Sequence, residues 1–159
     1  MTLTPTSTTT FVVNGQEVAV RADHPHLLAA LREELDVTSP KDGCSPSGQC
    51  GACTVLLDGK SIQSCLVSLE KASSKEVTTL EGFDPVERDR LATAFSAAGA
   101  LQCGFCTPGF VMASVACLEK HGTPDREQVV HELSGNICRC GTYPRIFDAV
   151  EKAANGGRR

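Results

Sequence analysis

A chain of 159 residues is long enough for one ordinary domain or two small ones. Its formal net charge of −4 comes without a cluster of lysine or arginine, which excludes the usual basic footprint for nucleic acid. No apolar run approaches the roughly 20 residues that cross a bilayer, so membrane insertion is not expected.

The chain begins MTLTPTSTTT, which carries neither the basic nor the apolar segment of a signal peptide. We expect residues 1–9 to form a disordered tail. Without an export signal, the protein is expected to be cytoplasmic and its cysteines to be reduced.

Residues 10–82 predict a small α+β domain built from two hairpins and one helix. TFVVNGQEVAVRA alternates around Asn14-Gly15, and TVLLDGKSIQSC turns at Asp58-Gly59, both typical of two-residue hairpin turns. Between them, HPHLLAALREEL spaces leucines on one helical face, with Pro25 suited to the first turn. KEVTTLEG predicts a last strand.

Residues 83–155 predict four short helices. Three begin with a capping residue followed by proline, at Asp84, Thr107 and Thr123. The last helix begins at Pro144 in PRIFDAVEKAAN. Short connections between four helices predict an antiparallel bundle.

Nine cysteines are the outstanding feature of the composition. In a cytosolic protein, gathered thiols usually hold metal rather than form disulfides. Cys117 lies in the middle of a predicted helix, and we interpret it as a buried thiol that packs as a small apolar side chain. The histidines lie far from the other cysteines in the sequence and are expected at the surface or at helix caps: His24, His26, His121 and His131.

The first set of cysteines follows the pattern Cys44-x5-Cys50-x2-Cys53-x11-Cys65, close to the plant-type [2Fe–2S] spacing. Three of these thiols share a loop rich in glycine and serine. Such a backbone turns freely and can aim N–H groups at the sulfurs of an anionic cluster. Zinc is the alternative for four cysteines, although the spacing is unlike that of zinc knuckles.

The second set is Cys103-x2-Cys106-x31-Cys138-x-Cys140. Only Arg139 separates the last two thiols, which are badly placed to bond each other without strain. Each pair precedes a predicted helix, whose free N–H groups and dipole favour an anion. We therefore expect a metal centre between the pairs, with zinc again the alternative. Arg139 either offsets the charge of that centre or contacts a partner.

No nucleophile–base arrangement, phosphate loop or pair of carboxylates stands out, so we expect no bond chemistry on this chain itself. With both cysteine sets in place, GCSPSGQCGACTVLLDGKSIQSC, LQCGFCTPGFVM and NICRCGTYPRI resemble the small iron–sulfur subunit of the molybdenum hydroxylases. This is the family of xanthine dehydrogenase, aldehyde oxidoreductase and aerobic carbon monoxide dehydrogenase. The resemblance spans residues 10–154.

The resemblance implies a ferredoxin-like β-grasp domain followed by a four-helix bundle, with one [2Fe–2S] cluster in each. The implied ligands are Cys44, Cys50, Cys53 and Cys65 in the first domain and Cys103, Cys106, Cys138 and Cys140 in the second. One departure is the loop from Cys44 to Cys50, which encloses five residues where the family often has four. We expect the extra residue to bulge toward solvent.

The resemblance also implies partners and a direction of electron flow. The helical cluster would lie nearer the molybdopterin cofactor of a large subunit, with Gln102 and Cys140 close to the pterin. The other cluster would face the next acceptor, usually FAD on a medium subunit, in a dimer of heterotrimers. The implied function is electron transfer, one electron at a time; a free-standing two-cluster ferredoxin-type carrier is the alternative.

Overall fold

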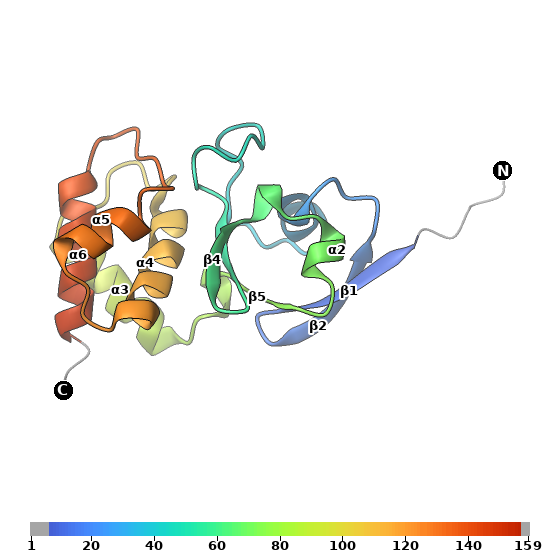
Figure 1. Cartoon of the computed structure of the whole chain (residues 1–159), viewed down its shortest axis with the longest axis horizontal. Coiled ribbons are helices and arrows are strands. Elements are labelled where there is room, and N and C mark those ends of the chain that lie inside the picture. Colours follow the sequence, from blue (N-terminus) through green and yellow to red (C-terminus); the bar gives the residue numbers. More distant parts are fainter. Residues whose placement is uncertain (1–6, 157–159) are drawn as a thin grey trace.

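The computed structural model describes residues 7–156 and has an α+β fold, as the sequence predicts (Figure 1). One mixed sheet has the strand order β2-β1-β5-β3-β4. Strands β1 and β5 run parallel, and all other neighbouring strands are antiparallel. The strands are β1 (Thr8–Val13), β2 (Gln16–Arg21), β3 (Thr54–Leu57), β4 (Lys60–Gln63) and β5 (Glu76–Thr78).

Both predicted hairpins are confirmed. Asn14 and Gly15 join β1 to β2 with φ of 52° and 77°, and Asp58 and Gly59 join β3 to β4 with φ of 49° and 77°. Two consecutive positive φ angles are what a type I′ turn needs, and Asn-Gly and Asp-Gly adopt them most readily. The register of both hairpins therefore follows from the turn residues.

The predicted tail at residues 1–9 is wrong at its end, because β1 begins at Thr8. Strand β2 extends to Arg21 and so offers β1 a pairing partner as far back as Thr8. Thr9 pairs with Val20 in the same ladder. The first six residues of the predicted tail lie outside the described part of the chain.

The helix predicted in HPHLLAALREEL is a short α-helix, α1 (Leu27–Ala29), that continues as a π-helical segment, η1 (Ala30–Glu34). Pro25 does not lie in its first turn as predicted. His26 is the N-cap instead, because its Nδ1 accepts a hydrogen bond from the backbone N–H of Ala29 at 3.1 Å. Three further short elements follow: η2 (Ser64–Leu66), α2 (Leu69–Ala72) and η3 (Leu80–Gly82).

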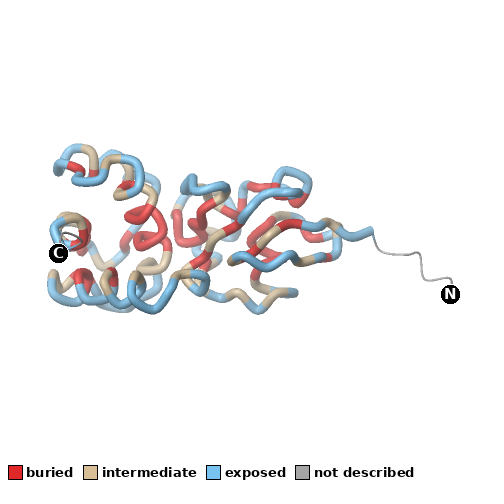
Figure 2. Tube along the Cα trace, turned by 90° about the horizontal axis from the view of Figure 1, so that it is seen from below, coloured by how far each residue is buried: buried red, intermediate tan, exposed pale blue. Residues whose placement is uncertain are grey.

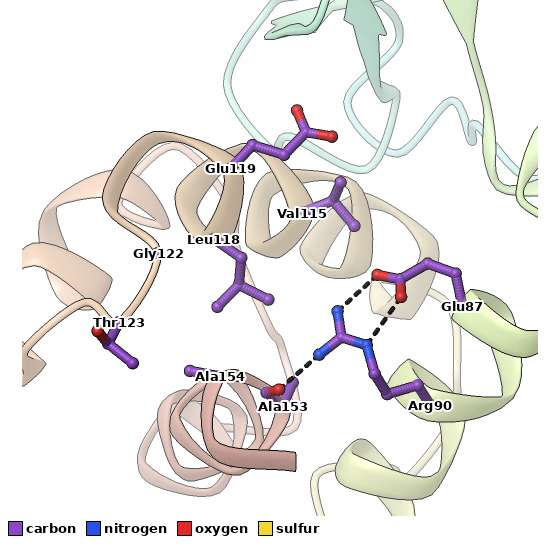
Figure 3. A pocket seen from close by; sticks show the side chains of 9 residues that line it. All are labelled: Glu87, Arg90, Val115, Leu118, Glu119, Gly122, Thr123, Ala153 and Ala154. Atoms are coloured by element: carbon purple, nitrogen blue, oxygen red, sulfur yellow. Dashed lines mark hydrogen bonds and ion pairs between the residues drawn. The ribbon is translucent and has the colours of Figure 1, made fainter. Parts of the chain in front are cut away.

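The described residues after 83 contain four α-helices, drawn on the side of Figure 1 away from the N-terminus. Helix α3 packs against α6, and α4 contacts both α5 and α6. Figure 3 shows Arg90 of α3 paired with Glu87 and donating to the backbone carbonyl of Ala153 in α6. The four are α3 (Pro85–Ala97), α4 (Thr107–His121), α5 (Arg126–Glu132) and α6 (Tyr143–Gly156).

The predicted helix starts are correct at α3, wrong at α4 and α5, and one residue late at α6, which begins at Tyr143 rather than Pro144. Asp84 caps α3 by accepting from the N–H of Glu87, as expected. The cap of α4 is Cys106 rather than Thr107. Helix α5 starts after Asp125 rather than at Thr123, because Asp125 forms a reciprocal capping box with Gln128.

Each half has its own apolar core, and Figure 2 shows buried stretches in both. Phe11 and Leu31 lie in the core of the sheet half, whereas Phe110 and Leu133 lie in that of the helical half. Leu56 of β3 belongs to the helical core, since α4 packs against β3. None of the helices within residues 7–156 combines the length and apolarity that crossing a membrane requires.

Candidate metal centres

Seven of the eight predicted ligands lie on loops at the edge where the sheet half meets the helical half, and the eighth, Cys65, lies in the short helix η2. In Figure 1 these loops are at the upper edge, above β4 and above the helices. One cleft is lined by thiols of both sets, namely Cys44 and Cys50 from the first and Cys103 and Cys106 from the second. None of the nine cysteines forms a disulfide bond.

The β3–β4 hairpin returns the fourth cysteine of the first set to the loop that carries the other three. Thr54 pairs with Gln63, so Cys53 just before β3 lies beside the residues that follow β4. Ser64 donates its hydroxyl and its N–H to the Cys53 carbonyl, at 2.8 and 3.3 Å. The Cys53 and Cys65 thiols are buried within hydrogen-bonding reach of each other.

Hydrogen-bond donors on the loop face the sulfur of Cys44. The Ser47 hydroxyl and the backbone N–H of Gln49 lower the pKa of Cys44 to about 6, since both stabilise the thiolate. Cys50 lies beside Cys44, and burial raises the pKa of Cys50. The loop is thus built to stabilise negative charge on one of its sulfurs.

The donors lower the pKa of Cys44, whereas burial raises the pKa of Cys65 in the same set. Burial raises the pKa of Cys65 to about 12, and the neighbouring Cys53 adds to this rise. A backbone N–H, that of Gly48, points at the Cys65 sulfur. Gly48 has a φ of 71° and lies over the Leu66 side chain, where an added Cβ would approach to 2.7 Å. Both features favour glycine at this position.

In the second set, Cys103 and Cys106 lie in the connection from α3 to α4, and Cys138 and Cys140 in the connection from α5 to α6. The structure brings the two connections together, as predicted. The sulfurs of Cys103 and Cys140 are 3.6 Å apart, and the Cys106 thiol lies within hydrogen-bonding reach of Cys138. Each thiol therefore faces a partner from the other connection rather than its neighbour in the chain.

Cys138 is held by two residues at the start of α6, Thr142 just before the helix and Tyr143 as its first residue. The Thr142 hydroxyl lies 3.2 Å from the Cys138 sulfur, and the Tyr143 hydroxyl accepts the backbone N–H of Cys138 at 2.8 Å. Burial raises the pKa of Cys138, but hydrogen bonds from the Thr142 hydroxyl and N–H lower it to about 7. Burial, followed by the nearby Cys138, raises the pKa of Cys106 to about 12.

The thiols of each set fit a two-iron cluster in number and in chemistry. Four cysteine thiolates are the donors of a [2Fe–2S] cluster, and here each set consists of two pairs of neighbouring thiols. Hydroxyl and backbone N–H groups point at the sulfurs, as an anionic cluster requires. Among residues 7–156 no three cysteine, histidine or carboxylate groups converge tightly enough for a single metal ion.

The remaining candidate residues lie apart from these pairs or at their rim. Gln102 is exposed next to Cys103, and Arg139 lines the cleft between the two sets. Cys117 is fully buried in the helical core, as predicted, and burial raises its pKa to about 11. The histidines contact carboxylates or backbone: His24 meets Glu34, His26 caps α1, and His121 and His131 lie near Glu132.

Sequence reasoning missed the polar residues that support the thiols. The hydroxyls of Thr142 and Ser47 lie against cysteine sulfurs, and Asn136 donates across the two halves to the Gly51 carbonyl at 2.8 Å. Their nearness to cysteines in the chain was the available signal. Ser47 lies between the first two cysteines, and both Asn136 and Thr142 flank the Cys138–Cys140 segment.

Two protein-family models cover the chain almost end to end. A model described as a 2Fe-2S iron-sulfur cluster binding domain matches residues 11–80. A second, described as a [2Fe-2S] binding domain, matches residues 79–151. The two matches meet between β5 and α3.

Curated relatives match over nearly the whole chain. One nicotinate dehydrogenase subunit of Pseudomonas putida is 42% identical, with 96% of this chain and 98% of that protein covered. The aldehyde oxidoreductase iron-sulfur-binding subunit PaoA of Escherichia coli O157:H7 is 39% identical, with 91% of this chain and 70% of that protein covered.

Solved structures agree with these relatives. A chain of quinoline 2-oxidoreductase from Pseudomonas putida 86 superposes with a TM-score of 0.86 at 35% identity, covering 96% of both chains. Aldehyde oxidoreductase from Desulfovibrio desulfuricans ATCC 27774 gives the same TM-score at 42% identity. That match covers 95% of this chain but 17% of the other, so the same fold also occurs within a much longer polypeptide.

Proposed function

Because this chain belongs to the iron–sulfur subunits of the molybdenum hydroxylases, it is an electron-transfer subunit of an oxidoreductase, and we propose how its residues divide that task. Residues 10–82 form the β-grasp ferredoxin-like domain and residues 83–155 the four-helix domain. Each domain holds one [2Fe–2S] cluster, which supplies a site that accepts and releases one electron at a time.

The proposed ligands follow the two sets of thiols. Support comes from one observation: each set brings together two pairs of neighbouring thiols, faced by hydroxyl and N–H donors. The proposed ligands of the sheet half are Cys44, Cys50, Cys53 and Cys65, and those of the helical half are Cys103, Cys106, Cys138 and Cys140.

We further propose that electrons enter at the helical set and leave from the sheet set. Cys103 is exposed and Cys140 half-exposed, so the helical set reaches the surface that a larger subunit would cover. Gln102 beside them would lie near the molybdopterin of that subunit. Larger partner subunits are part of this family. We propose that a medium FAD subunit is the acceptor and that the assembly is a cytoplasmic dimer of heterotrimers.

Metal analysis and spectroscopy of the purified complex test this function. We expect four irons and four sulfides per chain and two distinct paramagnetic signals after reduction. A chain that purifies alone at native expression would favour the free-standing carrier, which the known relatives support less. Zinc in place of iron would refute the proposal.

A further inference from the structure

The two halves are joined by a cluster of hydrogen bonds between their cysteine loops. The backbone N–H of Ile137 donates to the Cys50 carbonyl at 2.9 Å, so a residue next to one predicted ligand contacts another. Asn136 donates from Nδ2 to the Gly51 carbonyl at 2.8 Å. The bond from Asn136 to Gly51 joins residues 85 positions apart in the chain. Gly51 directly follows Cys50, and Asn136 lies two residues before Cys138.

The backbones approach unusually closely at this junction. A Cβ at Gly51 would lie 2.4 Å from the Gly135 carbonyl and 2.7 Å from Nδ2 of Asn136. A Cβ at Gly109, near the start of α4, would lie 2.4 Å from the Gly51 carbonyl. Real Cβ atoms do not approach other atoms so closely, so the two glycines allow the loops to meet. We call Gly51, Gly109 and Asn136 the loop junction.

We propose that Asn136 is a positioning residue whose side chain, seated between the two glycines of the loop junction, fixes the separation of the two metal centres. This inference rests on the proposed function and adds a role that neither cysteine set needs in order to hold metal. Asn136 is 6% exposed, and its Nδ2 donates to the Gly51 carbonyl and, at 3.3 Å, to the Thr54 hydroxyl, so it acts through the sheet loop. Electron transfer depends steeply on distance, and a loose junction would therefore slow transfer between the centres.

Removal of the Asn136 side chain leaves the Gly51 carbonyl of the sheet loop with other hydrogen-bond donors. The Gly51 carbonyl also accepts the hydroxyl of Thr54 at 2.7 Å and its N–H at 3.1 Å. Asn136→Ala therefore deletes the side-chain link between the loops, leaves the backbone bond from Ile137 to Cys50 in place, and does not leave the Gly51 carbonyl unpaired. Gly109→Ala tests the junction from the other side, because alanine favours helix α4 but its Cβ pushes against Gly51.

The experiment measures the separation of the two reduced centres by pulsed dipolar EPR on the dithionite-reduced complex. The unchanged protein should give one narrow distance distribution. Asn136→Ala should broaden it, and Gly109→Ala should shift it to longer distance. In stopped-flow reduction, electron arrival at the sheet centre should be slower in both variants while the spectra of the individual centres stay unchanged.

Two matched controls separate positioning from general disturbance. Ser134→Ala removes a hydrogen bond from the same loop, but one that stays in the helical half, to the His131 carbonyl. Gly156→Ala adds a Cβ to a helix where nothing lies within 4 Å. Both should keep the narrow distribution. If Asn136→Ala and Gly109→Ala kept it too, the positioning role would be refuted, whereas absence of two signals from the unchanged complex would instead refute the proposed function.

Discussion

The sheet half carries three of its four thiols on one loop, whereas the helical half carries them as two pairs with 31 residues between them. In the sheet half, a glycine-rich backbone and a type I′ hairpin bring the thiols together. In the helical half, the packing of α4, α5 and α6 brings together connections that are distant in the chain. One centre therefore depends on local turn chemistry and the other on tertiary packing, and mutations should affect them differently.

The largest expected effects come from removing one centre at a time, which tests the order in which the two centres are reduced. Cys138→Ser should remove the helical centre and prevent reduction of both centres by the substrate of the complex. Cys50→Ser should leave the helical centre reducible while turnover is lost. EPR after anaerobic addition of substrate distinguishes these outcomes. Cys117→Ala is the control, since this ninth thiol is buried in the apolar core and both signals should remain.

If Cys50→Ser also prevented reduction of the helical centre, the proposed order would be reversed. Loss of either signal in Cys117→Ala would show that the ninth thiol matters to a centre. Both readouts require the complex to remain assembled, which gel filtration checks.

A second test compares dependence on packing. Phe110 is fully buried and meets the Tyr143 ring edge-on, with ring centroids 6.1 Å apart, and Tyr143 in turn holds the N–H of Cys138. Phe110→Ala should lower the free energy of unfolding by about 3–5 kcal/mol and broaden the helical EPR signal. Phe11→Ala, an equal truncation in the sheet core, should cost a similar amount and spare that signal. Urea denaturation and EPR measure the two effects.

A smaller effect concerns electron affinity. Thr142→Val keeps the shape of the side chain but removes the hydroxyl 3.2 Å from the Cys138 sulfur. A hydrogen bond to a ligand sulfur stabilises the reduced, more negative state, so its loss should lower the midpoint potential of the helical centre. A bond worth about 1 kcal/mol corresponds to roughly 40 mV for one electron. Redox titration should show no change at the sheet centre, and Thr142→Ser should restore the original value.

The smallest expected effect lies away from both centres and depends on pH. Lys120, followed by His121, lowers the pKa of Glu132 to about 2. A lowered pKa in the folded state adds stability above the unfolded value near 4.5, and this stability is lost as the pH falls toward 2. Glu132→Gln should therefore lower stability by about 1 kcal/mol at neutral pH and less in acid. Glu127→Gln, which removes an exposed carboxylate from the same helix, is the matched control.

Local features of the fold were predictable because they depend on a few neighbouring residues. Asn14-Gly15 and Asp58-Gly59 specify their turns directly, and Asp84 followed by proline specifies a helix start. The start of α5 was misplaced because two capping candidates lie two positions apart, and Asp125 with its reciprocal partner outcompetes Thr123. The local sequence shows both candidates but does not predict which of them caps the helix.

The cysteine spacing predicted which thiols come together, but it did not predict what supports them. The bond from Asn136 to Gly51 joins positions 85 apart, and neither residue stands out by periodicity or charge. The Thr142 hydroxyl meets the Cys138 sulfur only because the turn after Cys140 brings it back toward Cys138. Such contacts arise from the packing of two loops, which no local pattern encodes.

Leu56 has a practical consequence for anyone who recombines these proteins. Leu56 belongs to strand β3 but packs in the core of the helical half. A fragment that ends between the two halves would therefore expose this leucine to water. Chimeras that exchange one half between relatives should therefore co-transfer the helix surface that receives this side chain. Such hybrids would need a matching surface for Leu56 as well as a matching loop junction.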